Sequence, residues 1–189
     1  MKILGFIASP RREGNTAYVV NKILEGAKEQ GADTQARYAC DCNINPCKGC
    51  LGCTQGNGCV VRDDMQELYD ELKHTDVLIL GSPVYMGQMS AQAKVFTDRL
   101  FAQITPRFSP RFKEENAGKK LVLVWTQGNP DPEMFRVYFD YTRHMFEMLE
   151  FEVKGVHVIT GTRNGPVNKR ENFGPSMKDI GISLVSELS

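Results

Sequence analysis

Four closely spaced cysteines are the residues of this chain best suited to metal chemistry. Between positions 47 and 59 the sequence follows the pattern C-x2-C-x2-C-x5-C. Thiols at such short, regular intervals surround one small centre, which is typical of ferredoxin-type [4Fe–4S] ligation. The glycines between them allow the tight backbone turns that such a site needs. We therefore expect a [4Fe–4S] cluster whose ligands are Cys47, Cys50, Cys53 and Cys59.

Two other uses of these thiols stay open at this point. A structural zinc site usually takes two C-x2-C pairs separated by about a dozen residues, which is not the spacing here, although four thiols could hold zinc compactly. A redox disulfide could also join Cys50 to Cys53, or Cys47 to Cys50. All six cysteines of the chain lie between positions 40 and 59. We interpret the first two, Cys40 and Cys42, as buried or spare thiols outside the site.

A polar loop after the first apolar segment, Lys2–Ile7, has the composition of an anion-binding site. In an open α/β sheet such a loop lies at the carboxyl ends of the strands, where ligands bind, and it leads into a helix N-terminus that favours negative charge. The loop has neither the G-x-G-x-x-G fingerprint nor a Walker sequence, and its residues are also ordinary turn and cap residues. The candidate phosphate-binding residues are Ser9, Arg11, Arg12, Gly14, Asn15 and Thr16.

Two further glycine-containing loops are expected at the same edge of the sheet. Together with the first loop they could hold a flat ring system above a bound phosphate, with Tyr85 stacking on the ring. The alternative is that Tyr85 and Met86 only cover the edge of the core. The candidate ring-binding residues are Pro83, Val84, Tyr85, Met86 and Gly87 after the third strand, and Gln127, Gly128 and Asn129 after the fourth.

The order of the apolar segments predicts the fold that positions these loops. Strands are expected at 2–7, 34–39, 77–80, 121–125 and 153–159, and their alternation with helical segments is the pattern of a parallel sheet. Right-handed crossovers then favour a doubly wound, five-stranded, flavodoxin-like α/β fold with strand order 2-1-3-4-5. We expect a single domain over 1–189. Its cysteine-rich loop insertion, 40–62, follows strand two and should open on the same edge as the ring-binding loops.

The segments that connect these strands are predicted to contain further helices and one long loop. A helix is predicted to begin at Asp63, with Gln66 as its partner in a capping box. Later helices are expected at 90–103 and 132–149. The polar connection 105–118 between them is interpreted as a solvated loop, with a mobile loop or an oligomer contact as alternatives.

The composition argues against several classes of function. The chain has 189 residues, of which 41% are hydrophobic, and its 23 basic and 23 acidic side chains give no net charge. Proteins that bind nucleic acids or anionic membrane surfaces need an excess of basic residues. No segment approaches the ~18 to 20 consecutive apolar residues of a membrane-spanning helix, and the apolar start is too short for a signal peptide. We expect a cytoplasmic protein with no nucleic-acid or membrane partner.

The motifs taken together resemble the iron–sulfur flavoproteins, within the NAD(P)H-dependent FMN reductase branch of the flavodoxin-like proteins. The resemblance covers positions 2 to about 125. It rests on the S-P-R-x-x-G-N-T loop, the cysteine pattern, the D-D-M that follows it, and P-V-Y-M-G-Q-x-S-A-Q-x-K-x-F-x-D-R from Pro83 to Arg99. Beyond it, segment 127–132 lacks the Gly-Gly of that family's fourth loop. Because of this departure, the resemblance does not extend to the ring-edge contacts of Gly128 and Asn129 or to the choice of electron donor.

This resemblance implies two cofactors and an assembly. The first loop would hold the phosphate of FMN, the 83–87 loop would flank its isoalloxazine ring, and the four cysteines would hold a [4Fe–4S] cluster. Family members are homo-oligomers with the flavin near a neighbouring subunit, so a homodimer or homotetramer is implied. The electron donor would be NAD(P)H or a small redox protein such as ferredoxin.

The function predicted on these grounds is an FMN-dependent redox protein that passes electrons between FMN and a [4Fe–4S] cluster. Such chemistry is carried by the cofactors and needs no side-chain acid or base, so the three histidines are interpreted as structural or surface residues. One alternative is an NAD(P)H-dependent FMN or quinone reductase whose cysteine loop is structural or zinc-binding. Another is a zinc- or thiol-based sensor or assembly module without enzymatic activity.

Overall fold

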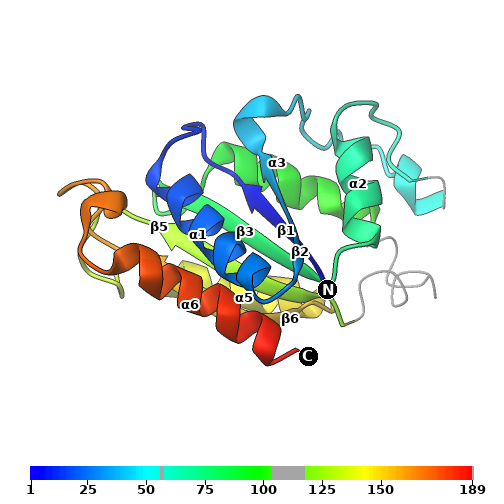
Figure 1. The fold of residues 1–189 in the computed structure, drawn as a ribbon. Helices are drawn as coiled ribbons and strands as arrows, with labels where there is room; N and C mark the ends of the chain where they lie inside the picture. The colour runs from blue at the N-terminus through cyan, green and yellow to red at the C-terminus, as the bar shows by residue number, and fades with distance from the viewer. Residues whose placement is uncertain (56–57, 104–117, 189) are drawn as a thin grey trace.

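A parallel sheet of five strands forms the centre of the computed structural model, which describes residues 1–55, 58–103 and 118–188 (Figure 1). Its strand order is β2-β1-β3-β5-β6, which is the predicted order 2-1-3-4-5 once the strands are counted along the chain. A short sixth strand, β4, pairs antiparallel with the end of β3. The strands are β1 (Lys2–Ile7), β2 (Asp33–Tyr38), β3 (Val77–Tyr85), β4 (Gln88–Met89), β5 (Lys120–Thr126) and β6 (Glu152–Ile159).

Helices cover both faces of the sheet, as the doubly wound prediction requires (Figure 1). One buried cluster joins the sheet to α1 (Asn15–Glu29) and α6 (Phe173–Ser186). The other joins it to α2 (Met65–Lys73), α3 (Ala91–Arg99) and α5 (Arg136–Met148). The short 3-10 turns are Ala39–Asp41, Gly52–Gln55, Leu100–Ala102 and Val167–Lys169. No helix within the described ranges is long and apolar enough to cross a membrane.

Strand β3 runs five residues beyond the predicted end at Leu80, and this is a correction to the expected loop at 81–89. Gly81 marks a close approach between elements and not a turn, since a Cβ there would lie 2.4 Å from the side chain of Val20 on α1. Pairing with β5 continues as far as Pro83, opposite Thr126. Helix α5 likewise begins at Arg136, later than predicted. The predicted connection 105–118 lies outside the described residues except for its last position.

Helices α1 and α6 pack through glycines, which lets their backbones approach closely. A Cβ added at Gly181 would lie 2.0 Å from the carbonyl oxygen of Ile23, and one at Gly26 would lie 2.0 Å from that of Lys178. Backbone atoms cannot yield as a flexible side chain can. This contact fixes α1, whose N-terminus follows the first candidate loop.

We predict that Gly181→Ala destabilises the protein, because its methyl group forces the two helices apart. Overpacking of this kind lowers the free energy of unfolding by about 1–3 kcal/mol, which urea denaturation would measure. Ser183→Ala, at an exposed position of the same helix, is the matched control and should change stability little. Equal stability of both variants would contradict the close packing.

Candidate functional site

Three loops meet at the carboxyl edge of the sheet, as the sequence predicts. The strand register sets Ile7 beside Gly81 and Pro83 beside Thr126, so the loops that follow β1 and β5 flank the end of β3. The Ala8 N–H donates to the Gly81 carbonyl oxygen at 2.7 Å. The loops are therefore fixed to one another by backbone pairing, and we call this edge the rim.

The first loop folds tightly around the start of α1. The Arg11 N–H donates to Ser9 Oγ at 3.1 Å, and the Gly14 N–H donates to the Arg11 carbonyl oxygen at 3.1 Å. A Cβ at Gly14 would lie only 3.2 Å from that carbonyl oxygen. Gly14 is the N-cap and provides no side-chain cap. The helix thus starts with backbone N–H groups available to an anion, which is the arrangement that favours phosphate.

Two of the predicted phosphate-binding residues in this loop use their side chains in hydrogen bonds to other parts of the protein. The Asn15 Oδ1 accepts a hydrogen bond from the Val167 N–H at 3.0 Å. The Thr16 hydroxyl, which is buried, lies 2.7 Å from the Thr126 hydroxyl at the end of β5. These side chains hold the loop against its neighbours, and the geometry leaves their backbone N–H groups as the natural contacts for a ligand.

The two adjacent arginines of the loop differ in their surroundings. Arg12 forms an ion pair with Asp41 and lies over the ring of Tyr38, 4.5 Å from its centroid. Arg11 is exposed, and its side chain has no ion-pair partner among the described residues. Arg11 is therefore the cation of this loop that is free to meet an anion, whereas Arg12 is turned toward the end of β2.

The predicted ring-binding loop after the third strand is a β-hairpin. Val84 and Tyr85 pair with Met89 and Gln88 across a turn in which Met86 has φ 50° and Gly87 has φ 79°. Positive φ at both central positions is the geometry of a type I′ turn. The hairpin leaves Met86 99% exposed and Tyr85 44% exposed. It therefore projects from the rim with two large side chains available to a ring or to another surface.

The base of this hairpin is joined to the first loop by two buried serines. Ser82 Oγ accepts from the Ser90 N–H at 2.9 Å, and Ser90 Oγ donates to the Ala8 carbonyl oxygen at 2.6 Å. Ser90 also caps α3, since its Oγ accepts from the Ala93 N–H. The start of α3 is thus tied to the end of β1.

In the third loop, Gln127 shapes the backbone. Its side chain is 1% exposed, and its Nε2 donates to the carbonyl oxygens of Asp131 at 2.6 Å and Asn129 at 3.2 Å. Gln127 Oε1 is buried and has no hydrogen-bond partner among the described residues. Arg163 lies across Gly128, because a Cβ there would be 2.7 Å from Arg163 Cγ. Arg163 was not predicted, although its position after the fifth strand placed it at this rim.

The cysteine segment extends outward beside α2 (Figure 1). Its four predicted ligands line one small cavity of about 40 Å³. All four are free thiols, with Cys47 and Cys50 exposed and Cys53 and Cys59 partly buried. Leu51, with φ 56°, takes a left-handed conformation that is unusual for a branched residue. Four thiols are a soft donor set that suits zinc or an iron–sulfur cluster. Across the described ranges, however, no three potential ligands are grouped closely enough to hold a metal ion.

The cavity does not open on the rim, contrary to the expectation from strand order. It is lined by Asp98, Arg99, Phe101 and Ala102, at and just beyond the C-terminal end of α3, whereas the rim hairpin leads into the N-terminal end of that helix. Nine helical residues separate the two ends, which is about 13 Å. The segment is held in this position by contacts among Asn45, Val61, Asp63 and Arg99, which the sequence did not reveal. We call the place where these residues meet the neck of the segment.

A buried ion pair between Arg99 and Asp63 closes that neck. Both side chains are 1% exposed, and Arg99 Nη1 lies 2.7 Å from Asp63 Oδ2. The same guanidinium donates to the carbonyl oxygens of Asn45 at 2.8 Å and Val61 at 3.4 Å, one on each side of the cysteine segment. Asp63 Oδ2 also accepts from the Asn45 N–H at 2.8 Å.

The predicted capping box between Asp63 and Gln66 is therefore wrong. Helix α2 begins at Met65, whose N–H donates to Asp63 Oδ1 at 3.1 Å. Gln66 Nε2 donates instead to the carbonyl oxygen of Val61 at 2.6 Å. Asp63 accepts a hydrogen bond from the first residue of α2 and is, at the same time, the counter-ion of a residue 36 positions away.

Burial and pairing shift the pKa of the Asp63 carboxyl in opposite directions. Burial alone would raise the pKa of Asp63, but hydrogen bonds from Arg99 and from two backbone N–H groups hold it below its usual value. A lowered carboxyl pKa stabilises the folded state at neutral pH, and this contribution is lost as the pH falls through the folded-state pKa. Burial raises the pKa of Tyr69, whose hydroxyl donates to the Arg99 carbonyl oxygen at 2.6 Å.

The other two cysteines lie outside the cavity, as interpreted from the sequence. The Cys42 thiol lies 3.3 Å from the Tyr38 carbonyl oxygen and lines a separate polar pocket of about 350 Å³ with Arg12 and Asp41. Burial raises the pKa of this thiol. Cys40 is exposed.

Comparison with known proteins gives a family for this arrangement. The profile of the NADPH-dependent FMN reductase family matches residues 1–159. An iron-sulfur flavoprotein of Methanocaldococcus jannaschii is 42% identical over 99 residues, which are 52% of this chain and 51% of that protein. A putative NAD(P)H-dependent FMN-containing oxidoreductase of Bacillus subtilis is 27% identical over 88% of this chain and 89% of its own. The chain spans about half the length of the iron–sulfur relatives it matches.

Among solved structures, an NAD(P)H:quinone oxidoreductase from Methanothermobacter marburgensis superposes with a TM-score of 0.74. The alignment covers 97% of this chain and 96% of that one at 15% sequence identity. Similarity at this level of identity supports the flavodoxin-like fold and not a particular activity.

We predict that the two arginines of the first loop contribute unequally to FMN binding. Arg11→Ala should weaken binding about tenfold or more, because a hydrogen bond to a charged group is worth about 1.5–3 kcal/mol. Arg12→Ala is the matched control and should change affinity less, since Arg12 already pairs with Asp41. Titration of apoprotein with FMN, followed by flavin fluorescence, measures both. A larger effect at Arg12 would contradict this geometry.

Proposed function

Because the chain belongs to the NADPH-dependent FMN reductase family, we propose that it is a flavin-dependent oxidoreductase that passes electrons between FMN and a [4Fe–4S] cluster. The observation that carries the proposal is the cavity shared by all four cysteines of the C-x2-C-x2-C-x5-C segment. Relatives named iron-sulfur flavoproteins match 99 residues, about half of this chain. We further propose NAD(P)H as the donor, which agrees with the wording of the family and of the Bacillus subtilis relative.

In this proposal the protein binds and orients, and it supplies no acid or base. Arg11 and the start of α1 hold the FMN phosphate, while the 83–87 hairpin and residues 127–129 border the ring. Cys47, Cys50, Cys53 and Cys59 hold the cluster. When bound, FMN exchanges two electrons with a donor and an iron–sulfur cluster carries one at a time.

A second candidate is an NAD(P)H-dependent FMN or quinone reductase whose cysteine loop is structural or binds zinc. The version with a structural loop is favoured by the arrangement of the thiols, which share a cavity but are not gathered into a coordination shell within the described residues. It also agrees with the quinone oxidoreductase whose fold covers nearly the whole chain.

Anaerobically purified protein separates the two candidates. We predict bound FMN together with iron and acid-labile sulfide, and we predict that Cys50→Ser abolishes the cluster absorbance while FMN stays bound. Cys40→Ser, outside the cavity, is the matched control and should keep both. Unchanged iron in Cys50→Ser would contradict the ligand assignment. Stoichiometric zinc with no iron in the wild-type protein would favour the second candidate.

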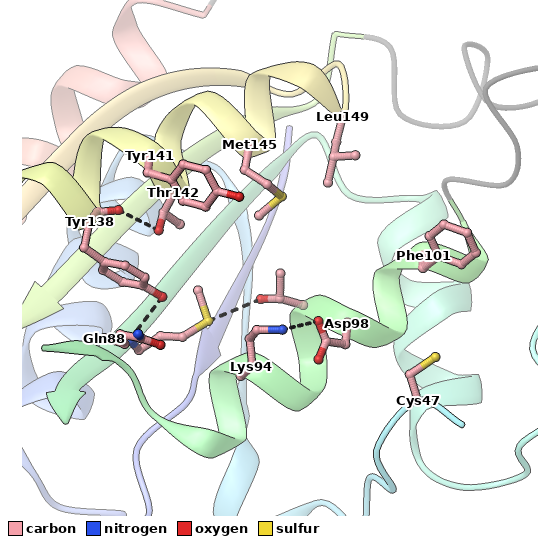
Figure 2. A pocket seen from close by; sticks show the side chains of 12 residues that line it. Cys47, Gln88, Lys94, Asp98, Phe101, Tyr138, Tyr141, Thr142, Met145 and Leu149 are labelled. Carbon is pink, nitrogen blue, oxygen red and sulfur yellow. Dashed lines mark hydrogen bonds and ion pairs between the residues drawn. The ribbon is translucent and has the colours of Figure 1, made fainter. Parts of the chain in front are cut away.

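A second copy of this chain is the partner proposed for the exposed face of α5. A groove of about 650 Å³ runs between α3 and α5, from Gln88 near the rim to Cys47 and Phe101 near the cysteine cavity (Figure 2). Beside it α5 exposes large apolar side chains, including Val137 at 86% and Tyr141 at 67%. Contiguous exposed apolar surface of this kind usually marks an interaction site.

Two features of this face favour a copy of the same chain over a different protein. Five apolar residues are spaced symmetrically about Tyr141, namely Met134 just before α5, and Val137, Tyr141, Met145 and Met148 on it. Two antiparallel copies of this segment would present the same pattern to each other, as a two-fold interface requires. The charges nearby are paired within the chain, as in Arg136 with Glu133 and Arg143 with Glu147. An antiparallel arrangement brings the rim of one copy toward the cysteine cavity of the other.

We predict that Tyr141→Glu converts the protein to monomers, because it places a charge at the centre of the apolar stripe. Sedimentation velocity measures the change. Ser183→Glu on α6, also exposed, is the matched control and should leave the assembly intact. A wild-type protein that is monomeric at micromolar concentration would refute the interface.

A further inference from the structure

The hydrogen bonds of Arg99 to Asn45, Val61 and Asp63 leave one N–H group of its guanidinium without a partner among the described residues. Nη1 donates to Asn45 O at 2.8 Å and Asp63 Oδ2 at 2.7 Å, and Nη2 donates to Asp63 Oδ1 at 3.1 Å and Val61 O at 3.4 Å. These four contacts occupy four of the five donors of an arginine. Nε is buried and has no hydrogen-bond partner among the described residues.

An unpartnered buried N–H is rare in proteins and calls for an acceptor. Arg99 lines the cavity that contains the four cysteines. Burial lowers the pKa of Arg99, pairing with Asp63 and then with Tyr69 raises it, and nearby Cys59 raises it by less than either. The one carboxylate that lines the cavity, Asp98, is already paired with Lys94 at 2.5 Å. The cysteine sulfurs are then the remaining side-chain acceptors among the described residues that line the cavity.

We propose that Arg99 Nε–H donates a hydrogen bond to a sulfur of the group held by the four cysteines, and that Arg99 thereby raises the reduction potential of that group. This inference rests on the proposed function. An N–H···S bond and a nearby positive charge stabilise the more negative, reduced state, which makes reduction easier. Arg99 therefore has two roles, since the four donors on its terminal nitrogens anchor the segment while the fifth adjusts the cofactor.

A matched pair of substitutions separates these roles. Arg99→Lys keeps the charge and the ion pair with Asp63 but removes the Nε–H. We expect the one-electron reduction equilibrium of the cluster to shift about tenfold, which is about 59 mV toward lower potential. Arg37→Lys is the control, because Arg37 pairs with Glu71 on α2 and does not line the cavity. The potential is measured by a spectroscopic redox titration of anaerobic protein, together with iron and sulfide content.

The outcomes distinguish this inference from the proposed function. Wild-type protein without iron and sulfide overturns the proposed function and, with it, the premise of this inference. Wild-type and Arg99→Lys proteins that are equally loaded and have the same potential overturn the inference alone. If Arg99→Lys does not load, Asp63→Asn decides, since it weakens the neck but keeps the Nε–H. Its potential should stay constant or rise with the loss of a negative charge, and a fall would overturn the inference.

Discussion

The buried pair of Arg99 and Asp63 is the interaction on which the arrangement of the cysteine segment depends. Removing two charges from water is expensive, and such a pair is favourable only when its remaining donors and acceptors are also satisfied. Here they are supplied by the backbone on both sides of the segment, at Asn45 and Val61. The pair therefore ties residues before and after the four cysteines to the end of α3. A segment with little apolar surface of its own gains a defined position in this way.

The rim is positioned by hydrogen bonds between neighbouring strands and not by a buried ion pair. Each loop there continues from a strand that is paired along its length, and the buried serines at 82 and 90 connect the strand ends to α3. The rim is thus held by hydrogen bonds at its base, while its tips expose Tyr85 and Met86. Rigid bases with adaptable tips are how parallel sheets commonly build ligand sites.

The sheet, its strand order and the meeting of three loops could be predicted because they follow from local patterns. Alternating apolar segments and right-handed crossovers leave few topologies. The neck could not be predicted in the same way. Asp63 has the local signature of a helix cap, and nothing within a few residues indicates that its partner is Arg99, 36 positions later. The end of β3 was missed for a related reason, since Gly81 is as suitable for a turn as for the close approach to Val20 that it makes.

The different roles of two adjacent residues of the same type were the hardest feature to predict from the sequence. Nothing in the order Arg11-Arg12 tells which side chain faces a ligand, and only the position of Asp41 after β2 decides it. The ion pair between Arg12 and Asp41 also connects two loops that are far apart in the sequence. Arg12 belongs to the first loop and Asp41 lies near the start of the cysteine-rich loop 40–62, so their ion pair, with Tyr38 beneath the guanidinium, connects the two loops directly. Because the Arg12 and Asp41 side chains are 59% and 48% exposed, salt should weaken this link between the two loops while leaving the core of the sheet unaffected.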